Sequence, residues 1–293
     1  MEIIISRQRM MSVAREIRRE GNHTIGFVPT MGALHAGHLS LVREARVRCD
    51  VVVVSVFVNP AQFGPKEDFT SYPRDLTRDS ALLAESKVDY VFAPAVAEIY
   101  PKGFSTYVTV EGLSEGLEGA ARPGHFRGVT TVVALLLNII RPDFAFFGQK
   151  DAQQAILIKQ MVGDLAFDSE VVVLPTAREG SGLALSSRND YLDDEQREAA
   201  TVLYRSLSRA AAEYDKGERK AERLIEAVKS TIEKDPLARI DYVSINDAET
   251  LDKLDRIEDR PALLSLAVYI GKARLIDNIV LGERKPEAAG AVR

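Results

Sequence analysis

Apolar and polar positions alternate in short blocks over residues 1–175, and each block fits one strand or one helix. Residues 51–58 form a β-branched and aromatic run, interrupted only by Ser55, which is typical of a strand buried on both faces of a parallel sheet. In residues 39–48, Leu39, Val42 and Ala45 fall on one face of a helix. The same patterns predict further strands at 3–5, 24–28, 88–92, 106–110, 144–147 and 170–174, and helices at 9–20, 75–86, 129–140 and 151–162. This alternation predicts an α/β fold built on a Rossmann-like, doubly wound parallel sheet.

The pattern changes after Pro175, where helices come first and strands follow. Asp193 and Gln196 fit a capping box that begins a helix over residues 193–214, and a second helix covers 221–233. Alternating stretches at 240–245, 262–270 and 273–281 predict strands. We therefore expect a Rossmann-like domain over residues 1–176 and a smaller α+β domain over 177–283. A disordered tail is expected over 284–293, which contains Pro, Gly and Ala without periodicity.

Composition and charge argue against several classes of protein. The formal net charge of -5 and the pI near 5.6 leave no global basic field for nucleic acid. The most apolar runs, at 51–58 and 132–140, are too short to span a bilayer. Cys49 is the single cysteine, and its place between a helix and an apolar strand favours a buried structural thiol over a reactive one. Since the first residues lack a signal-peptide arrangement, we expect a cytoplasmic protein.

The stretch from Thr24 to Val42 predicts a strand, a tight loop punctuated by glycine and proline, and a helix that opens near Gly37. His35 and His38 lie three positions apart at the start of this helix, so both imidazoles share one face. A helix N-terminus attracts phosphate through its unpaired N–H groups and its partial positive charge. The histidines could also simply cap and pack the helix, but the glycines and the strand–loop–helix context favour a phosphate-handling site.

Lys150 lies in a second arrangement of strand, glycine turn and helix, over residues 147–151. Its ammonium group would reach phosphate oxygens as a compact charge, although a lysine at such a point is also commonly a solvated surface group. Residues 181–189 carry two hydroxyls and a guanidinium in sequence, which suit a triphosphate but are also ordinary loop composition.

Three neutral amides, those of Asn59, Gln62 and Gln154, follow predicted buried strands. Such amides bind hydroxyls and a carboxylate without the cost of burying a charge, although each one singly is more often a group that satisfies a loop. Arg122, His125 and neighbouring glycines form a loop stretch that suits a lid or an anion clamp.

Residues 35–38 read His-x-Gly-His, which resembles the histidine signature of the nucleotidyltransferase superfamily. The longer string Pro29-Thr30-Met31-Gly32-Ala33-Leu34-His35-x-Gly37-His38 is similar to one family within it, pantothenate synthetase (pantoate–β-alanine ligase). Further blocks resemble the same family in order along the chain, at residues 58–63, 72–74, 98–101, 117–119, 122–129, 147–154, 183–189 and 273–278. The resemblance therefore covers nearly the whole chain.

This resemblance implies an ATP-dependent ligase that condenses pantoate with β-alanine and releases AMP and pyrophosphate, by way of a pantoyl adenylate. It implies Mg2+ on the ATP phosphates, with unidentified metal ligands, and a homodimer formed through the first domain. The smaller domain would close over ATP, and residues 64–72 would form a lid. No nucleic acid and no membrane would take part.

The implied site residues fall into three groups. The catalytic residues would be His38, as the family's proton donor, with His35, Lys150, Ser187 and Arg188. ATP would be contacted by Met31, Gly32, Ala33, Leu34, His35, Ala36, Gly37, His38, Gly148, Gln149, Lys150, Asp151, Ala177, Leu185, Ser186, Ser187 and Arg188. Gln62 would bind pantoate and β-alanine, Gln154 would bind pantoate, and Asn59 would join them in the substrate site.

The chain departs from the family pattern at a few positions. Gln149 stands where an acidic residue is more common, Gly180 and Ser181 stand where an acidic residue precedes Gly182, and Leu185 stands where Met is frequent. None of these changes removes a residue with an assigned chemical role.

Two rival functions fit the same motifs. One is another adenylyl or cytidylyl transferase on this fold, but Gln62 and Gln154 argue against it because a phosphorylated acceptor would call for more cations. The other is a non-catalytic nucleotide-binding regulator, which loss of His38 or Lys150 would have supported; both residues are present.

Overall fold

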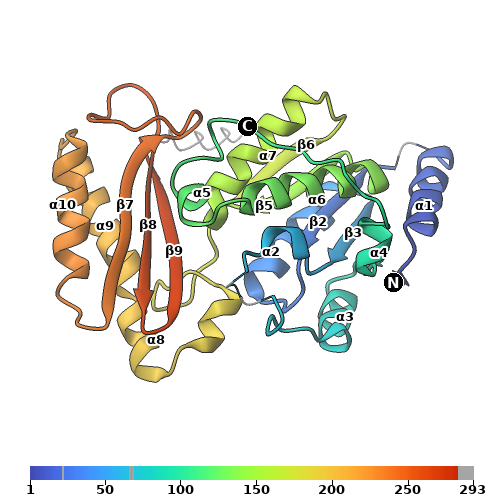
Figure 1. Ribbon diagram of the computed structural model, residues 1–293, viewed down its shortest axis with the longest axis horizontal. Helices are drawn as coiled ribbons and strands as arrows, with labels where there is room; N and C mark the ends of the chain where they lie inside the picture. The colour runs from blue at the N-terminus through green and yellow to red at the C-terminus, as the bar shows by residue number, and fades with distance from the viewer. Residues whose placement is uncertain (22, 66, 68, 283–293) are drawn as a thin grey trace, which may run out of the picture. The chain divides into compact units, whose positions relative to one another are not determined.

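Two units, each with its own sheet, make up the part of the chain that the computed structural model describes, which is residues 1–21, 23–65, 67 and 69–282. The first unit comprises residues 1–178 together with 185–187. The second comprises residues 179–184 together with the described residues from 188 onward. Figure 1 labels helices and strands of both units. The tail expected at 284–293 lies outside the described residues.

The first unit contains a six-stranded sheet, ordered β1-β4-β3-β2-β5-β6, in which every neighbouring pair is parallel. Its strands are β1 (Glu2–Ile4), β2 (Ile25–Thr30), β3 (Val51–Val56), β4 (Tyr90–Phe92), β5 (Phe144–Gly148) and β6 (Glu170–Leu174). Its helices are α1 (Arg7–Arg19), α2 (Ala36–Arg48), α3 (Leu76–Glu85), α4 (Val96–Ile99), α5 (Glu118–Ala121), α6 (His125–Ile140) and α7 (Ala152–Asp164), with 3-10 turns η1 (Pro60–Gln62) and η2 (Gln149–Asp151). The expected α/β fold with a doubly wound parallel sheet is confirmed.

Apolar side chains cover both faces of this sheet. Phe27 and Val53 belong to a core that includes buried residues of α1, α6 and α7. Their sequence neighbours Val28, Val52 and Val54 point the other way, into a core with residues of α2 and α3. Because successive strand residues face opposite sides, a strand between two helical layers is apolar at nearly every position. This explains the unbroken run that begins β3.

β2 extends two residues beyond the predicted strand and includes Pro29. Thr30 lies on the β3 side, where its carbonyl accepts from the Phe57 N–H at 3.1 Å. In a parallel sheet, adjacent residues of a strand direct their backbone N–H and C=O groups to opposite neighbouring strands. The backbone of Pro29 therefore faces β5. The pairing of β2 with β5 covers only Gly26 and Phe27. Pro29 therefore costs the sheet no hydrogen bond, which is why it does not end the strand.

The strand predicted at residues 106–110 is wrong. The segment has no strand pairing in the described structure, and its backbone is bonded by α6 side chains instead. The Val108 N–H donates to Thr131 Oγ1 at 3.0 Å, and Val108 O accepts from Thr130 Oγ1 at 2.7 Å. The helix predicted from residue 129 begins earlier, at His125, after Gly124 in a left-handed conformation with φ 82°. Residues 106–110 therefore lie along α6 and are not part of a sheet.

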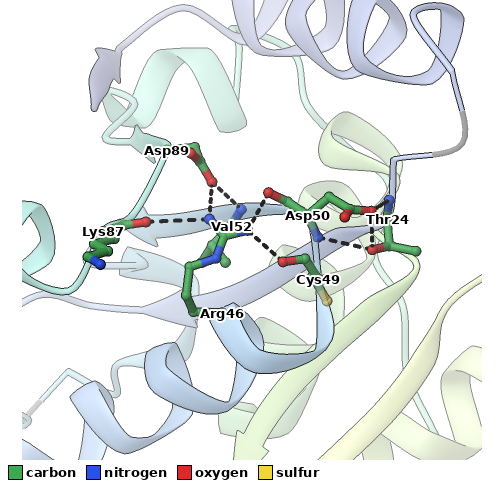
Figure 2. Close-up of polar contacts among 7 residues, drawn as sticks. All are labelled: Thr24, Arg46, Cys49, Asp50, Val52, Lys87 and Asp89. Carbon is green, nitrogen blue, oxygen red and sulfur yellow. Dashed lines mark hydrogen bonds and ion pairs between the residues drawn. The ribbon is translucent and has the colours of Figure 1, made fainter.

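Aspartates directly before the strands organise the amino-terminal edge of the sheet (Figure 2). Asp50, before β3, accepts from the Thr24 N–H at 2.8 Å, and Asp89, before β4, accepts from the Val52 N–H at 2.8 Å. Arg46 donates to the Asp89 carboxylate at 2.6 Å and to the Cys49 carbonyl at 2.5 Å. These contacts satisfy strand ends that would otherwise leave unpaired amides. Cys49 itself is buried, and burial raises the pKa of its thiol to about 11, as expected of a structural thiol.

The second unit holds the antiparallel sheet β7-β8-β9, with α9 and α10 packed on it (Figure 1). Its elements are η3 (Ser187–Tyr191), which begins in the first unit, α8 (Asp194–Ala200), α9 (Val202–Asp215), α10 (Ala221–Ile232), β7 (Ala238–Asp247), β8 (Ala262–Ile270) and β9 (Ala273–Leu281). The capping box of Asp193 and Gln196 is confirmed. The single helix expected over 193–214 is interrupted at Thr201, whose hydroxyl donates to Glu198 O at 2.7 Å.

No helix among the described residues is long and apolar enough to cross a membrane.

Candidate active site

The loop between β2 and α2 is held by a buried carboxylate. Asp79, on α3 and 1% exposed, accepts hydrogen bonds from the backbone N–H groups of Ala33 and Leu34, both at 2.9 Å. Gly32 has φ 80°, and a Cβ there would lie 2.9 Å from Asp79 Oδ2. Only glycine fits this approach without strain. These contacts hold the loop where it leads into α2.

The two histidines lie side by side at the N-terminus of α2, with ring centroids 4.1 Å apart. His35 is the N-cap residue, and its Nδ1 accepts from the Gly37 N–H at 3.2 Å. His38 Nδ1 accepts from the His35 N–H at 3.4 Å. A ring nitrogen that accepts carries no proton, so in the neutral form each imidazole bears its proton on Nε2. Both rings are thus N–H donors.

Burial lowers the pKa of His38 to about 3, and the neighbouring His35 and Lys150 act in the same direction against the opposing charge of Asp151. His38 is therefore a neutral imidazole at neutral pH. It can donate a hydrogen bond from Nε2–H to developing charge, but it does not carry an imidazolium proton in this state.

Lys150 and Asp151 follow β5 in the turn η2, with Lys150 Nζ 3.6 Å from Asp151 Oδ1. Since both charges act on the pKa of His38, the two strand–turn–helix motifs found in the sequence lie together. Leu185 joins them: its N–H donates to Ala177 O at 2.9 Å, and its Cβ lies 3.6 Å from where a Cβ on Gly37 would be.

The Gln62 side chain is buried at the end of η1. Its Nε2 lies 3.2 Å from Met31 Sδ, and its Oε1 accepts from Asn59 Nδ2 at 2.9 Å. The structure therefore brings a predicted substrate residue against a predicted ATP residue. Gln154 is half-buried in the first turn of α7, in the same unit.

The serine–arginine motif is divided between the units. Ser186 and Ser187 belong to the first unit with the histidines, whereas Arg188 belongs to the second. Asn189, which follows, is 3% exposed and donates to Ala184 O at 3.0 Å within the second unit.

Arg122 and His125, expected in a lid or anion clamp, are bonded within the protein. Arg122 makes two 2.7 Å contacts with the carboxylate of Glu67 and one of 3.0 Å with His125 Nε2. His125 Nδ1 lies 2.8 Å from Gln62 O, and because a carbonyl only accepts, Nδ1 carries the proton. Burial, and then the charge of Arg122, lowers the pKa of His125 to about 4. This group supports the backbone of Gln62.

Sequence reasoning missed Asp79, which supports the histidine loop from a distant helix. A signal was available, because Asp79 lies four residues before the buried Leu83 and so on the inner face of α3. The sequence does not predict which N–H groups donate to this carboxylate, because Ala33 lies 46 residues away along the chain.

A family model described as pantoate-beta-alanine ligase matches residues 2–280. The chain belongs to this family. Among its curated members, pantothenate synthetase of Pelotomaculum thermopropionicum is 58% identical over 269 residues, covering 92% of this chain and 95% of the relative. Pantothenate synthetase of Heliobacterium modesticaldum is 56% identical over 281 residues, covering 96% and 99%.

Solved structures of the pantoate-beta-alanine ligase family match the fold as well. Pantothenate synthetase of Thermus thermophilus gives a TM-score of 0.89 at 47% identity, with 95% of this chain and 99% of that chain covered. The ligase of Francisella tularensis, described as complexed with beta-gamma ATP and beta-alanine, gives 0.79 at 38% identity, with 98% and 100% covered. The family expected from the sequence motifs is thereby confirmed.

Proposed function

We propose that this protein is a pantoate–β-alanine ligase, which joins pantoate to β-alanine with ATP and releases AMP and pyrophosphate. The observation that carries the proposal is the pair of histidines at the N-terminus of α2, in a chain of this family. A helix N-terminus with two added N–H donors suits a phosphate group that gains charge during reaction.

In the first proposed step, the carboxylate of pantoate attacks the α-phosphorus of ATP, and pyrophosphate leaves. An anion approaches an anion, so the protein must contribute position and charge neutralisation. His35 and His38 would donate from Nε2–H to the α-phosphate oxygens, and Lys150 would add a positive charge. Burial keeps His38 neutral, so it donates without competing for the proton of a substrate.

In the second proposed step, the amine of β-alanine attacks the acyl carbon of the pantoyl adenylate, and AMP leaves. Gln62 and Gln154 would hold pantoate, and Gln62 would also meet β-alanine. Neutral amides suit a substrate whose carboxylate has to remain nucleophilic, because a strong cation beside it would lower its reactivity. Excluding water would protect the adenylate from hydrolysis.

The remaining ATP contacts are proposals that rest on the family resemblance. Gly148, Gln149 and Asp151 accompany Lys150 in or next to η2, while Ala177 and Leu185 pair through their backbones. Ser186, Ser187 and Arg188 would bind the phosphates. Residues 64–72, expected as the lid, include 66 and 68, which lie outside the described residues.

Mg2+ is proposed to enter with ATP. Among the described residues, no group of three or more His, Cys, Asp or Glu side chains could hold a metal ion. Mg2+ typically keeps several waters and binds through substrate phosphates with one or two carboxylates, so the nucleotide would supply most of its ligands. The Asp151 carboxylate, beside Lys150, is the acidic group we propose at that place.

The partners and compartment also rest on the resemblance. We propose a homodimer formed through the first unit, a cytoplasmic location, and closure of the smaller domain over ATP with a domain boundary near residue 176. Light scattering at several concentrations would test the dimer, and a monomer at all of them would exclude it.

Pyrophosphate release from Mg-ATP with pantoate, measured with and without β-alanine, tests the function. Sustained release that requires both substrates, with stoichiometric AMP, is the expected result. Release without pantoate dependence would exclude the ligase and favour a transferase with another acceptor. ATP binding without pyrophosphate release would favour a nucleotide-binding regulator.

A further inference from the structure

Tyr100 belongs to a sequence block, residues 98–101, that the proposed mechanism does not use. It follows α4, and its ring packs against Phe57 and Phe104, with centroids 6.3 and 5.0 Å away. Its hydroxyl donates to Asn59 Oδ1 at 2.8 Å. Burial raises the pKa of Tyr100, so the hydroxyl keeps its proton and remains a donor. The packed ring and the short hydrogen bond fix one group on one acceptor.

The amide of Asn59 is 1% exposed and uses all of its hydrogen-bonding capacity inside the protein. Its Oδ1 accepts from the Tyr100 hydroxyl and, at 3.2 Å, from the Ala61 N–H. Its Nδ2 donates to Gln62 Oε1 at 2.9 Å and to Gly128 O at 3.1 Å. A backbone N–H only donates and a carbonyl only accepts, so these partners determine which end of the amide is oxygen. Asn59 therefore has no capacity left for a substrate.

The orientation of Asn59 determines that of Gln62. Because Asn59 offers an N–H, Gln62 must present its oxygen to it. The Gln62 Nε2 then lies on the opposite side, next to Met31 Sδ at 3.2 Å. An Nε2 group suits a substrate with a carboxylate and hydroxyls, since it donates where those oxygens accept. A flipped amide would direct lone pairs at the carboxylate and weaken binding.

We propose that Tyr100 is a positioning residue for the pantoate site, acting through Asn59 to hold the donor end of Gln62 toward the substrate. The inference rests on the proposed function, in which Gln62 binds pantoate. Without the hydroxyl, Asn59 Oδ1 keeps only the longer bond from Ala61, and the amide that orients Gln62 is less firmly held.

Tyr100→Phe tests the proposal because it removes the hydroxyl and keeps the packed ring. We expect the KM for pantoate to rise about fivefold, the effect of one neutral hydrogen bond, with kcat within about twofold and the KM for ATP unchanged. Tyr107→Phe is the matched control: Tyr107 packs on Phe104 in the same aromatic group, and none of the four hydrogen bonds of Asn59 involves it. This control should leave all three constants unchanged.

A double-mutant comparison shows whether Tyr100 acts through Gln62. In a Gln62→Ala background, Tyr100→Phe should change kcat/KM for pantoate by less than about twofold, because the group it positions is gone. A full effect in that background would overturn the inference, and so would an unchanged KM for pantoate in the single variant. If the unaltered enzyme releases no pyrophosphate in response to pantoate, the proposed function fails first. Activity in the unaltered enzyme with no effect of Tyr100→Phe rejects this inference alone.

Discussion

The two ends of the parallel sheet in the first unit are both rich in polar groups, but they use them differently. At the amino-terminal edge, full charges neutralise one another: the Asp89 carboxylate accepts from both the Arg46 guanidinium and the Val52 N–H of β3. At the carboxyl-terminal edge, the Gln62 amide and the neutral His38 imidazole are each held by a hydrogen bond to a neighbouring group, and the Lys150 and Asp151 charges lie beside the histidine. The first arrangement pairs these charges within the protein. The second holds Gln62 by its Oε1 and His38 by its Nδ1, so the N–H donors of these two side chains lie at their other ends.

The largest effect is expected from the carboxyl-terminal edge. His38→Ala and Lys150→Ala should each lower kcat by about a hundredfold or more, the scale of losing one transition-state donor. His23→Ala is the matched control, because His23 lies in an exposed loop outside the site. Initial rates of pyrophosphate release check this prediction. A rate near that of the unaltered enzyme in either variant would contradict its assigned role.

The amide at this edge should affect binding more than turnover. Gln62→Ala should raise the KM for pantoate about tenfold, because a donor to the substrate carboxylate makes a charge-assisted hydrogen bond. Gln160→Ala, on α7 with its side chain bonded to Asp164, is the control. An unchanged KM for pantoate would remove Gln62 from the substrate site.

The amino-terminal edge should contribute stability and not catalysis. Arg46→Met keeps much of the aliphatic chain but removes the donors to Asp89 and to the Cys49 carbonyl. We expect a loss of about 1–3 kcal/mol in the free energy of unfolding, since partly buried acceptors lose their partner, with kcat within twofold. Urea unfolding and initial rates measure the two quantities. A large fall in kcat at unchanged stability would show that the two edges are not separate in function.

The last prediction concerns pH. The pKa of His125 is lowered to about 4, and an unfolded histidine has a pKa near 6.5, so below 6.5 the unfolded state binds a proton that the folded state does not. The contribution of His125 to the free energy of unfolding should therefore be fully present above pH 6.5. It should decline as the pH falls toward 4, by up to about 1.4 kcal/mol per pH unit. His125→Asn should show a shallower decline in urea unfolding between pH 7 and 4.5. Equal slopes would mean that His125 is not kept neutral by folding.

The sequence predicted most of the elements because burial imposes a period on them. β6 has the predicted bounds, and the capping box of Asp193 lies where its two residues indicate. The errors arose where the backbone found partners that no local pattern describes. The extended residues 106–110 look like a strand because Val108 and its neighbours favour that conformation, but hydroxyls of α6 take the hydrogen bonds.

For the candidate site, the sequence identified the groups and not their orientation. His35, His38, Lys150 and Gln62 were found from residue type and their place at the ends of strands. Asp79 and Tyr100 were not assigned a role, because each acts on a group more than 40 residues away, at separations of 46 and 41. Asn59 was expected to meet the substrate, whereas its contacts favour a positioning role.

The sequence by itself determined the alternating elements, the parallel sheet and the helix start at the two histidines, because apolar periodicity, glycine turns and helix ends are local properties. The tertiary structure decided which nitrogen of His125 carries its proton and which end of the Asn59 amide is oxygen. Those choices depend on whether the opposing atom can donate or accept. For Asn59 that atom is a carbonyl 69 residues along the chain, and only folding brings it within reach.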